Sequence, residues 1–189
     1  MQAILATLDN ESDDIKDAAT LLLLRMSIDA PKGEPNAAAN REAIIANGGP
    51  EKLVAQLGQC GEDKERLMYT TVGCLGCIAA GGGVQASATH THTHNAAQPV
   101  TPAFWFARTV AGSVVCSASS CAMYVPLSVA VTCAEALTAA GAVRAIIDCL
   151  SGVGSSVVTV KQECASAIAN ITRVNPVACE TVMDCGGMR

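Results

Sequence analysis

The last third of the chain contains a cycle of helices that restarts at a glycine. A short apolar stretch ends at Gly141, a second helix follows, and after a Ser/Gly-rich loop a longer helix runs to Asn175-Pro176. The cycle reaches glycine again at Gly186, 45 residues after Gly141. This distance lies in the roughly 40–47-residue range of repeats built from two or three helices. Such a unit buries its apolar side only against its neighbours, so the repeat limits the chain to stacked helical units.

The same cycle fits residues 40–80. Asn40 is expected to cap a short helix that Gly48-Gly49 ends, because glycine accepts the left-handed conformation found there. Pro50 suits the first position of the next helix. A long helix then runs from about Lys64 to Ala80. The residues expected to face inward on the two longer helices are Leu53, Val54, Leu57, Leu67, Val72, Leu75 and Ile78.

Residues 1–28 fit the cycle in part. The chain begins as if inside a unit, because Ile4, Leu5 and Leu8 have the spacing of Leu53, Val54 and Leu57. A long helix is predicted from about Ile15 to Ile28, and the stretch from Ala30 to Ala39 reads as a loop with two prolines. The predicted inward side chains of this helix are Ile15, Ala19, Leu22, Leu23 and Met26. In the last unit they are Val143, Ile146, Ile147, Leu150, Val160, Cys164, Ala167, Ile168 and Ile171.

The long helix of the last unit carries Ala167-Ile168-Ala169-Asn170-Ile171. This run resembles the Ala-Leu-x-Asn-Leu core of an armadillo repeat, whose second helix also follows a small-residue turn. The resemblance covers residues 134–189 and 40–80 well, and residues 1–28 less completely. It implies an all-α fold, a right-handed α-solenoid of about three armadillo-type repeats in an ARM/HEAT-like superhelix.

Residues 82–131 interrupt the repeat pattern. They hold all three histidines and four of the five aromatic residues, and Arg108 is their one charged residue. Gly48 and Gly141 are 93 residues apart, which exceeds one unit of about 42 by roughly the length of this segment. We therefore divide the chain into armadillo-like repeats at 1–81, an insertion at 82–131, and at 132–189 a repeat plus the start of the next.

The nature of the insertion stays open at this point. The alternation of threonine and histidine from Thr89 to His94 is what a CA dinucleotide tract encodes in one reading frame. Translated intron is one interpretation, and a genuine low-complexity or disordered loop is another. A folded insertion is the third alternative. On the first interpretation, the chain is a truncated or mispredicted fragment of a longer armadillo protein.

Several motifs contain residue types that could form a metal, redox or phosphate site. His90, His92 and His94 could ligate zinc or nickel, but nothing around them supplies the fixed geometry or fourth ligand of a site. Cys74-x-x-Cys77 has redox or half-zinc spacing, yet it lies inside a helix, where buried cysteine is a small hydrophobe. Gly81-Gly82-Gly83 lacks the Lys-Ser/Thr of a phosphate-binding loop. We expect no cofactor and no enzymatic activity.

Composition and charge limit the partners. A net charge of −5 gives no reason to expect nucleic acid or an acidic membrane surface. The uncharged stretch 109–134 is long enough to cross a bilayer, but five serines and Pro126 weaken its apolarity, so a span is not expected. If residues 82–131 are genuine, a membrane-associated or metal-binding protein remains the alternative. No signal peptide is visible, and we expect a cytoplasmic protein, with the nucleus as the alternative.

The resemblance implies non-enzymatic protein binding, as a scaffold or adaptor that holds a protein or extended peptide on its concave face. In armadillo proteins that hold extended peptides, as nuclear-import adaptors do, the asparagine matched by Asn170 pairs with the backbone of the bound peptide. We assign Cys77 and Arg25 to the equivalent positions of the other two repeats, and the accompanying tryptophan is missing, since Trp105 lies in the insertion. The candidate contacts are Asn170, Arg173, Lys161, Arg25 and Lys16.

The two ends of the chain lead to one more expectation. Ile4, Leu5 and Leu8 begin abruptly, and the chain stops at Gly187-Met188-Arg189, where another helix should start. Terminal repeats of a solenoid normally carry a polar outer face, because an apolar end face is left uncovered. We therefore expect self-association through uncapped repeat ends.

Overall fold

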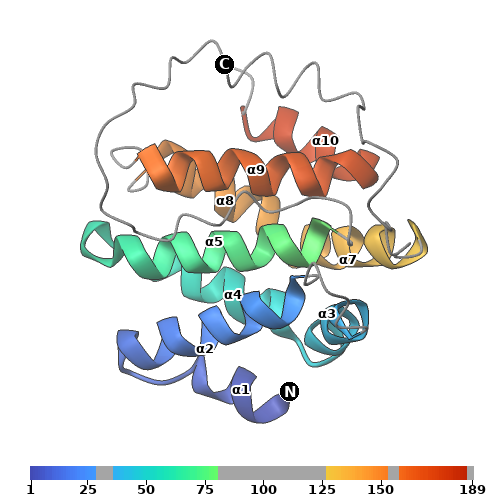
Figure 1. The fold of residues 1–189 in the computed structure, drawn as a ribbon. Coiled ribbons are helices and arrows are strands. Elements are labelled where there is room, and N and C mark those ends of the chain that lie inside the picture. Colours follow the sequence, from blue (N-terminus) through green and yellow to red (C-terminus); the bar gives the residue numbers. More distant parts are fainter. Residues whose placement is uncertain (29–35, 81–126, 153–157, 187–189) are drawn as a thin grey trace, which may run out of the picture. The chain divides into compact units, whose positions relative to one another are not determined.

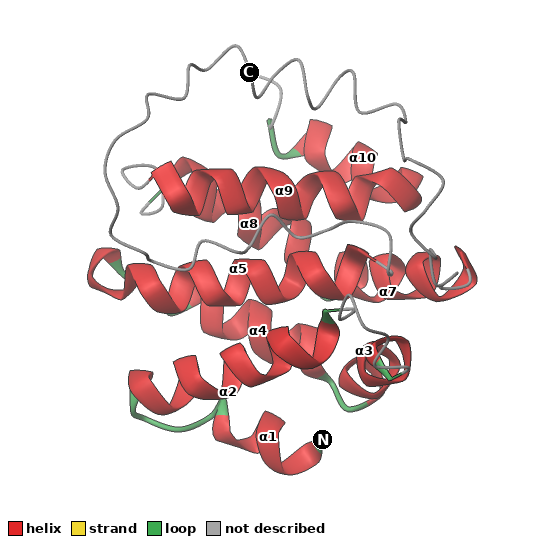
Figure 2. Cartoon of the chain, in the orientation of Figure 1, coloured by secondary structure: helices red, strands yellow, loops and turns green. Residues whose placement is uncertain are grey.

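A computed structural model describes residues 1–28, 36–80, 127–152 and 158–186, and every regular element in them is a helix (Figures 1 and 2). The helices belong to one compact unit, and a second unit, Gln85–Met123, lies outside the described residues. The predicted all-α class is confirmed. The elements are α1 (Gln2–Thr7), α2 (Asp13–Ser27), α3 (Ala37–Ala46), α4 (Gly49–Gly58), the 3₁₀ turn η1 (Glu62–Lys64), α5 (Glu65–Ala80), α7 (Leu127–Ala139), α8 (Ala142–Ser151), α9 (Val158–Val174) and α10 (Pro176–Asp184).

Three glycines mark the same point of the repeat. Gly48 lies between α3 and α4, Gly141 lies between α7 and α8, and Gly186 follows α10. Their φ angles are 74°, 80° and 75°, in the left-handed region that only glycine enters at little cost. This backbone conformation turns the chain sharply from one helix into the next. The glycine spacing predicted from the sequence is therefore a true structural register.

The helices stack in register with the repeat. The long helices contact one another in the order α2, α5, α9, while α4 contacts α8 and α3 contacts α7 (Figure 1). Corresponding helices of successive units are thus neighbours, although α5 and α9 are separated by 77 residues of chain. This pairing of like with like defines an α-solenoid.

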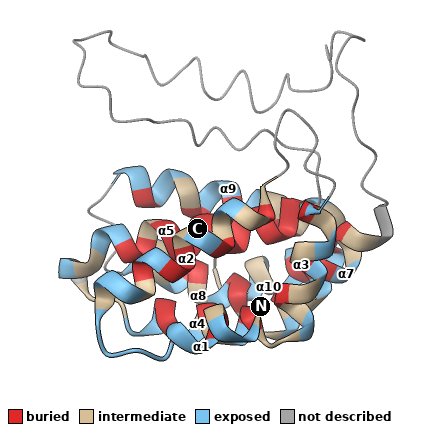
Figure 3. Cartoon of the chain, turned by 60° about the horizontal axis from the view of Figure 1, so that its bottom comes forward, coloured by how far each residue is buried: buried red, intermediate tan, exposed pale blue. Residues whose placement is uncertain are grey.

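The core runs continuously through the stacked units, as the buried residues in Figure 3 show. Most predicted inward side chains are buried. Leu53, Leu57, Leu67, Val72, Leu75, Ile78, Val143, Ile146, Ile147, Val160, Cys164, Ala167 and Ile171 are at most 5% exposed. Because α5 lies between α2 and α9, every residue from Thr70 to Ala80 is buried.

Ile15 and Leu22 were expected to face inward, and that prediction is wrong. They are 44% and 45% exposed, whereas Ala19 and Leu23 on the same helix are buried. The two exposed residues lie on the side of α2 where α1, a helix of six residues, is the neighbour. The short α1 and α5 do not cover this apolar helix completely.

Two helix starts also differ from the prediction. α3 begins at Ala37 rather than after Asn40, and Asn36 is its N-cap residue. Instead, Asn40 Nδ2 donates to Met26 O, and the buried Arg41 donates from Nη1 to Ser27 O at 2.7 Å, so both satisfy carbonyls at the C-terminal end of α2. α7 begins at Leu127, inside the range assigned to the insertion, since apolar helix formers continue across residue 131. The rest of the insertion, residues 82–126, lies outside the described residues.

The positive φ at Gly141 can be tested without any steric contribution. A Cβ at Gly141 would meet no atom within 4 Å, so Gly141→Ala measures the left-handed backbone alone. We expect a loss of about 1–2 kcal/mol in the free energy of unfolding, measured by urea denaturation. Gly58→Ala is the matched control, because its Cβ also meets nothing and Gly58 closes an ordinary helix. That substitution should be neutral or stabilise by up to about 1 kcal/mol. Equal changes in the free energy of unfolding for Gly141→Ala and Gly58→Ala would contradict the glycine register of the repeat.

Candidate protein-binding surface

The long helices α2, α5 and α9 form a row, and one side of this row faces away from α4 and α8 (Figure 1). We call it the long-helix surface and define it by Arg25, Tyr69, Glu163, Asn170 and Arg173. Arg25 and Arg173 are exposed, and by the 3.6-residue period each lies opposite the buried stripe of its helix. The surface is therefore assembled from three units far apart in sequence.

Asn170 connects two repeats. Its Nδ2 donates to the Gly76 carbonyl of α5 at 3.3 Å, and the side chain is half-buried. Among the described residues, Asn170 Oδ1 receives no hydrogen bond, so this acceptor remains for an incoming N–H group. The asparagine singled out by the family resemblance thus has one structural bond and one open acceptor.

Arg173 also reaches back to α5. Its Nη2 donates to Ala80 O at 3.1 Å. Ala80 is the last residue of α5, where carbonyls lack partners within the helix and the helix dipole favours a cation. The guanidinium has five N–H donors in all. Arg173 therefore stabilises the end of α5 while its exposed face can still donate to a carboxylate.

Glycines allow α9 to approach α5 closely. A Cβ at Gly76 would lie 3.2 Å from both Cα and Cβ of Ala167, and one at Gly73 would lie 3.2 Å from Glu163 Oε1. Larger residues would push the two helices apart. Glu163 is consequently held against α5 in the middle of the surface, and burial raises the pKa of its carboxyl. Burial, together with the nearby Glu163, also raises the pKa of Tyr69.

Lys16 and Lys161 were assigned to equivalent repeat positions, but they have different surroundings. Lys161 is exposed on α9. Lys16 lies one turn before Thr20, which hydrogen bonds to Gln56 of α4, so Lys16 also faces α4. Its Nζ lies 3.5 Å from Gln59 Oε1. We therefore leave Lys16 out of the long-helix surface.

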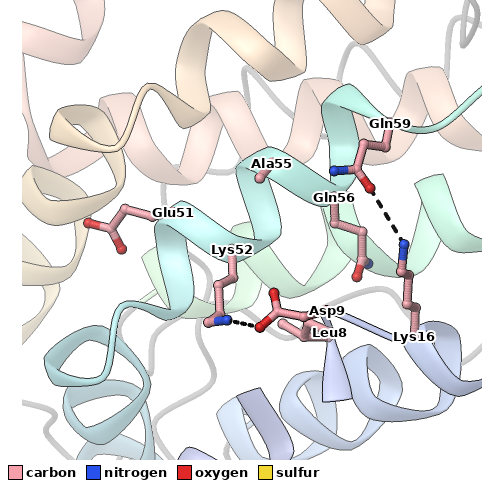
Figure 4. Close-up of a pocket in the computed structure, with 8 residues that line it drawn as sticks. All are labelled: Leu8, Asp9, Lys16, Glu51, Lys52, Ala55, Gln56 and Gln59. Carbon is pink, nitrogen blue, oxygen red and sulfur yellow. Dashed lines mark hydrogen bonds and ion pairs between the residues drawn. The ribbon is translucent and has the colours of Figure 1, made fainter. Parts of the chain in front are cut away.

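Figure 4 shows where Lys16 lies instead. It lines a pocket of about 350 Å³ between the end of α1, the start of α2, and α4, beside an ion pair between Lys52 and Asp9. The Gln56 amide is fixed nearby, because Nε2 donates to both Thr20 and Thr71, whose hydroxyls donate to carbonyls of their own helices. These bonds tie α2, α4 and α5 together in the core.

A second polar group that joins α2 and α5 was not predicted from the sequence. Asp17 is buried, accepts from Thr70 Oγ1 at 2.7 Å, and pairs with Arg66 Nε at 2.8 Å. Both partners belong to α5. The signal available in the sequence was a carboxylate within an apolar helix, which requires a partner if it is buried. Asp17 therefore fixes the register between the first two long helices.

The other candidate motifs are inert or fall outside the described part. Cys74 and Cys77 are buried free thiols, and burial raises the pKa of both, to about 12 for Cys77. His90, His92 and His94 lie outside the described residues, and within the described ranges no group of three or more His, Cys, Asp or Glu could hold a metal ion. In the same ranges no single helix is long and apolar enough to span a membrane. One pair of helices, Val129–Ala139 and Ala142–Ser151, is long and apolar enough when taken together, but the two are bent by 64°.

Comparison with known proteins agrees with the stacked helical units. The architecture defines a helical repeat protein of the α-solenoid class. Residues 132–173, which run from α7 to α9, match the family model described as "Armadillo/beta-catenin-like repeat". The match covers a single repeat and is consistent with the resemblance to armadillo repeat proteins. No curated protein sequence matches the chain. A solved structure titled "Crystal Structure of Engineered Protein" is 18% identical and covers 98% of this chain and 68% of its own, with a TM-score of 0.39, too low to support an argument.

The raised pKa of Glu163 gives stability a definite pH dependence. The folded protein holds the proton of the Glu163 carboxyl more tightly than the unfolded chain does. The contribution of this proton to stability is therefore fully present below the ordinary glutamate pKa of about 4.3. It is lost as pH rises through the raised folded value. We therefore expect Glu163→Gln to stabilise the protein near pH 7, and this gain to shrink toward pH 4, in urea titrations at both pH values. A stabilisation by Glu163→Gln that is largest at pH 4 would contradict a raised pKa of Glu163 in the folded protein.

Proposed function

We propose that the protein is a non-enzymatic scaffold that binds an extended segment of a protein partner on the long-helix surface. Armadillo repeats generally serve as scaffolds for protein interaction, which supports the broad role. The observation that carries the finer proposal is the open Oδ1 of Asn170, on a surface that also exposes two cations, Arg25 and Arg173. The proposed setting is the cytoplasm, with the nucleus as the alternative.

The chemistry of the surface indicates the kind of segment. An extended peptide exposes backbone N–H groups, and Asn170 Oδ1 can accept one of them. Arg25 has no hydrogen bond or ion pair among the described residues, and Arg173 uses one nitrogen on Ala80 O. Both guanidinium groups can therefore form bidentate pairs with carboxylates. We propose a partner segment that is extended and carries acidic side chains.

The proposal is tested with a display library of extended acidic peptides, followed by fluorescence anisotropy of the selected peptides. Arg25→Glu should raise the dissociation constant about tenfold or more, because attraction of the acidic peptide becomes repulsion. A tenfold rise corresponds to about 1.4 kcal/mol of binding free energy. Arg144→Glu is the matched control, since Arg144 is also exposed but lies on α8. Equal affinities of wild type and Arg25→Glu, or equal losses in both variants, would refute binding at this surface.

A second candidate interaction is self-association. α1 and α2 enclose a largely apolar groove of about 550 Å³, lined by Ala3, Ile4, Ile15, Ala18 and Leu22 among others. Val158, Val177 and Met183 are exposed on α9 and α10. We propose that the groove of one copy receives exposed apolar side chains of α9 and α10 from a second copy, as successive repeats stack.

If the protein self-associates, its average sedimentation coefficient should rise with protein concentration in sedimentation velocity experiments. Leu22→Glu places a charge in the groove and should shift the protein toward monomer, because burying an unpaired carboxylate is costly. Arg144→Glu, which also adds a carboxylate but lies on α8, should leave the distribution unchanged. A wild-type protein that is monomeric at every concentration would exclude this interaction.

A further inference from the structure

Two cysteines of the last complete repeat face each other across neighbouring helices. Cys149 lies near the end of α8 and Cys164 lies in α9, and their Sγ atoms are 3.9 Å apart. Cys164 is fully buried, whereas Cys149 is half-buried. The pair therefore has one sulfur that small reagents can approach and one that is shielded beside it.

The two thiols are not equivalent. The Cys164 thiol donates a hydrogen bond to Cys149 Sγ, and this donor lowers the pKa of Cys149 because it stabilises a thiolate there. The same bond, together with burial, raises the pKa of Cys164. The proton thus remains on Cys164, and Cys149 is the nucleophile of the pair.

Other cysteines in the described part lack this arrangement. Burial raises the pKa of Cys74, Cys77 and Cys133, and raises that of Cys60 to about 11. Cys179 is exposed, but its thiol contacts the carbonyls of Thr172 and Asn175 and no second sulfur. The combination of an approachable, activated sulfur and an adjacent thiol occurs, within the described ranges, at Cys149 and Cys164.

We propose that Cys149 is a site of oxidation by hydrogen peroxide, and that Cys164 converts the product to a reversible disulfide. The Cys149 thiolate sulfur attacks one peroxide oxygen and the O–O bond breaks. This step gives a sulfenic acid, and the departing hydroxide takes up a proton to become water. The Cys164 sulfur then attacks the Cys149 sulfur, the S–O bond breaks, and the hydroxyl leaves with the Cys164 proton as a second water. Overall, two thiols and one peroxide give one disulfide and two waters.

The bond would join α8 to α9 within the repeat. The sulfurs must approach by about 2 Å to reach bonding distance, a movement that the half-buried Cys149 side chain can supply by rotation. A disulfide between these residues restricts the unfolded chain, so the oxidised protein should melt at a higher temperature than the reduced one. The cross-link would also fix α9, the helix that carries Asn170 and Arg173.

Peptide mapping of the full chain tests the proposal directly. Trypsin cleaves after Arg144, Lys161 and Arg173, so Cys149 and Cys164 fall in separate peptides, 145–161 and 162–173. After reduction and mild peroxide treatment, we expect these peptides to be linked, with a mass 2 Da below their sum, and to separate with dithiothreitol. A linkage of Cys149 to Cys60 in peptide 53–64, or a Cys149 that stays a free thiol while Cys179 is oxidised, would overturn the proposal.

Two variants separate the roles of the sulfurs. In Cys164→Ser the sulfenic acid on Cys149 should persist and react with dimedone, a reagent for sulfenic acids. In Cys149→Ser, peptide 162–173 should keep its thiol. Cys179→Ser is the matched control and should form the disulfide at the wild-type rate. The wild-type map needs no variant, so it decides the question even if a substitution impairs folding. Dimedone labelling of Cys164 rather than Cys149 would reverse the proposed roles and refute them.

Discussion

The structure depends on burial of α5 between α2 and α9. This helix belongs to the middle unit, and every residue in its last eleven positions is buried. Neither outer long helix could stay in place without it, because α5 is the main helix against which both α2 and α9 pack. Burial of that apolar area supplies the main driving force, at roughly 25 cal/mol per Å². The solenoid is thus held together by contacts between residues far apart in sequence.

Polar bonds set the register in which these helices pack. Apolar contact is non-directional, so it would tolerate sliding of one long helix along another. Asp17 with Thr70 and Arg66 fixes α2 on α5, and Asn170 and Arg173 fix α9 on α5 through the Gly76 and Ala80 carbonyls. Residues of the proposed binding surface therefore also align the repeats. A partner that engages Asn170 or Arg173 would act on the same bonds that position the helices.

The repeat itself could be predicted because its signals are local. The left-handed glycines at 48, 141 and 186 and the apolar stripes of α4, α8 and α9 each follow from a short run of sequence. Ile15 and Leu22 could not be placed correctly, because a helical pattern does not reveal whether a neighbour covers a given side. Lys16 lies beside Gln59 at the end of α4, a neighbour that its equal spacing with Lys161 in the repeat does not reveal. The partner of Asp17 lies 53 residues away, and no pattern within α2 points to it.

The last repeat combines two properties on one helix. The inner side of α9 packs Cys164 against Cys149, while its outer side carries Asn170 and Arg173. Six residues, less than two helical turns, separate Cys164 from Asn170, and a helix transmits displacement along its axis because its backbone bonds are continuous. A cross-link that shifts or fixes α9 against α8 must therefore act on the contacts that α9 makes with α5. The proposed oxidation of the Cys149–Cys164 pair and the proposed recognition at the long-helix surface would thus be connected through α9.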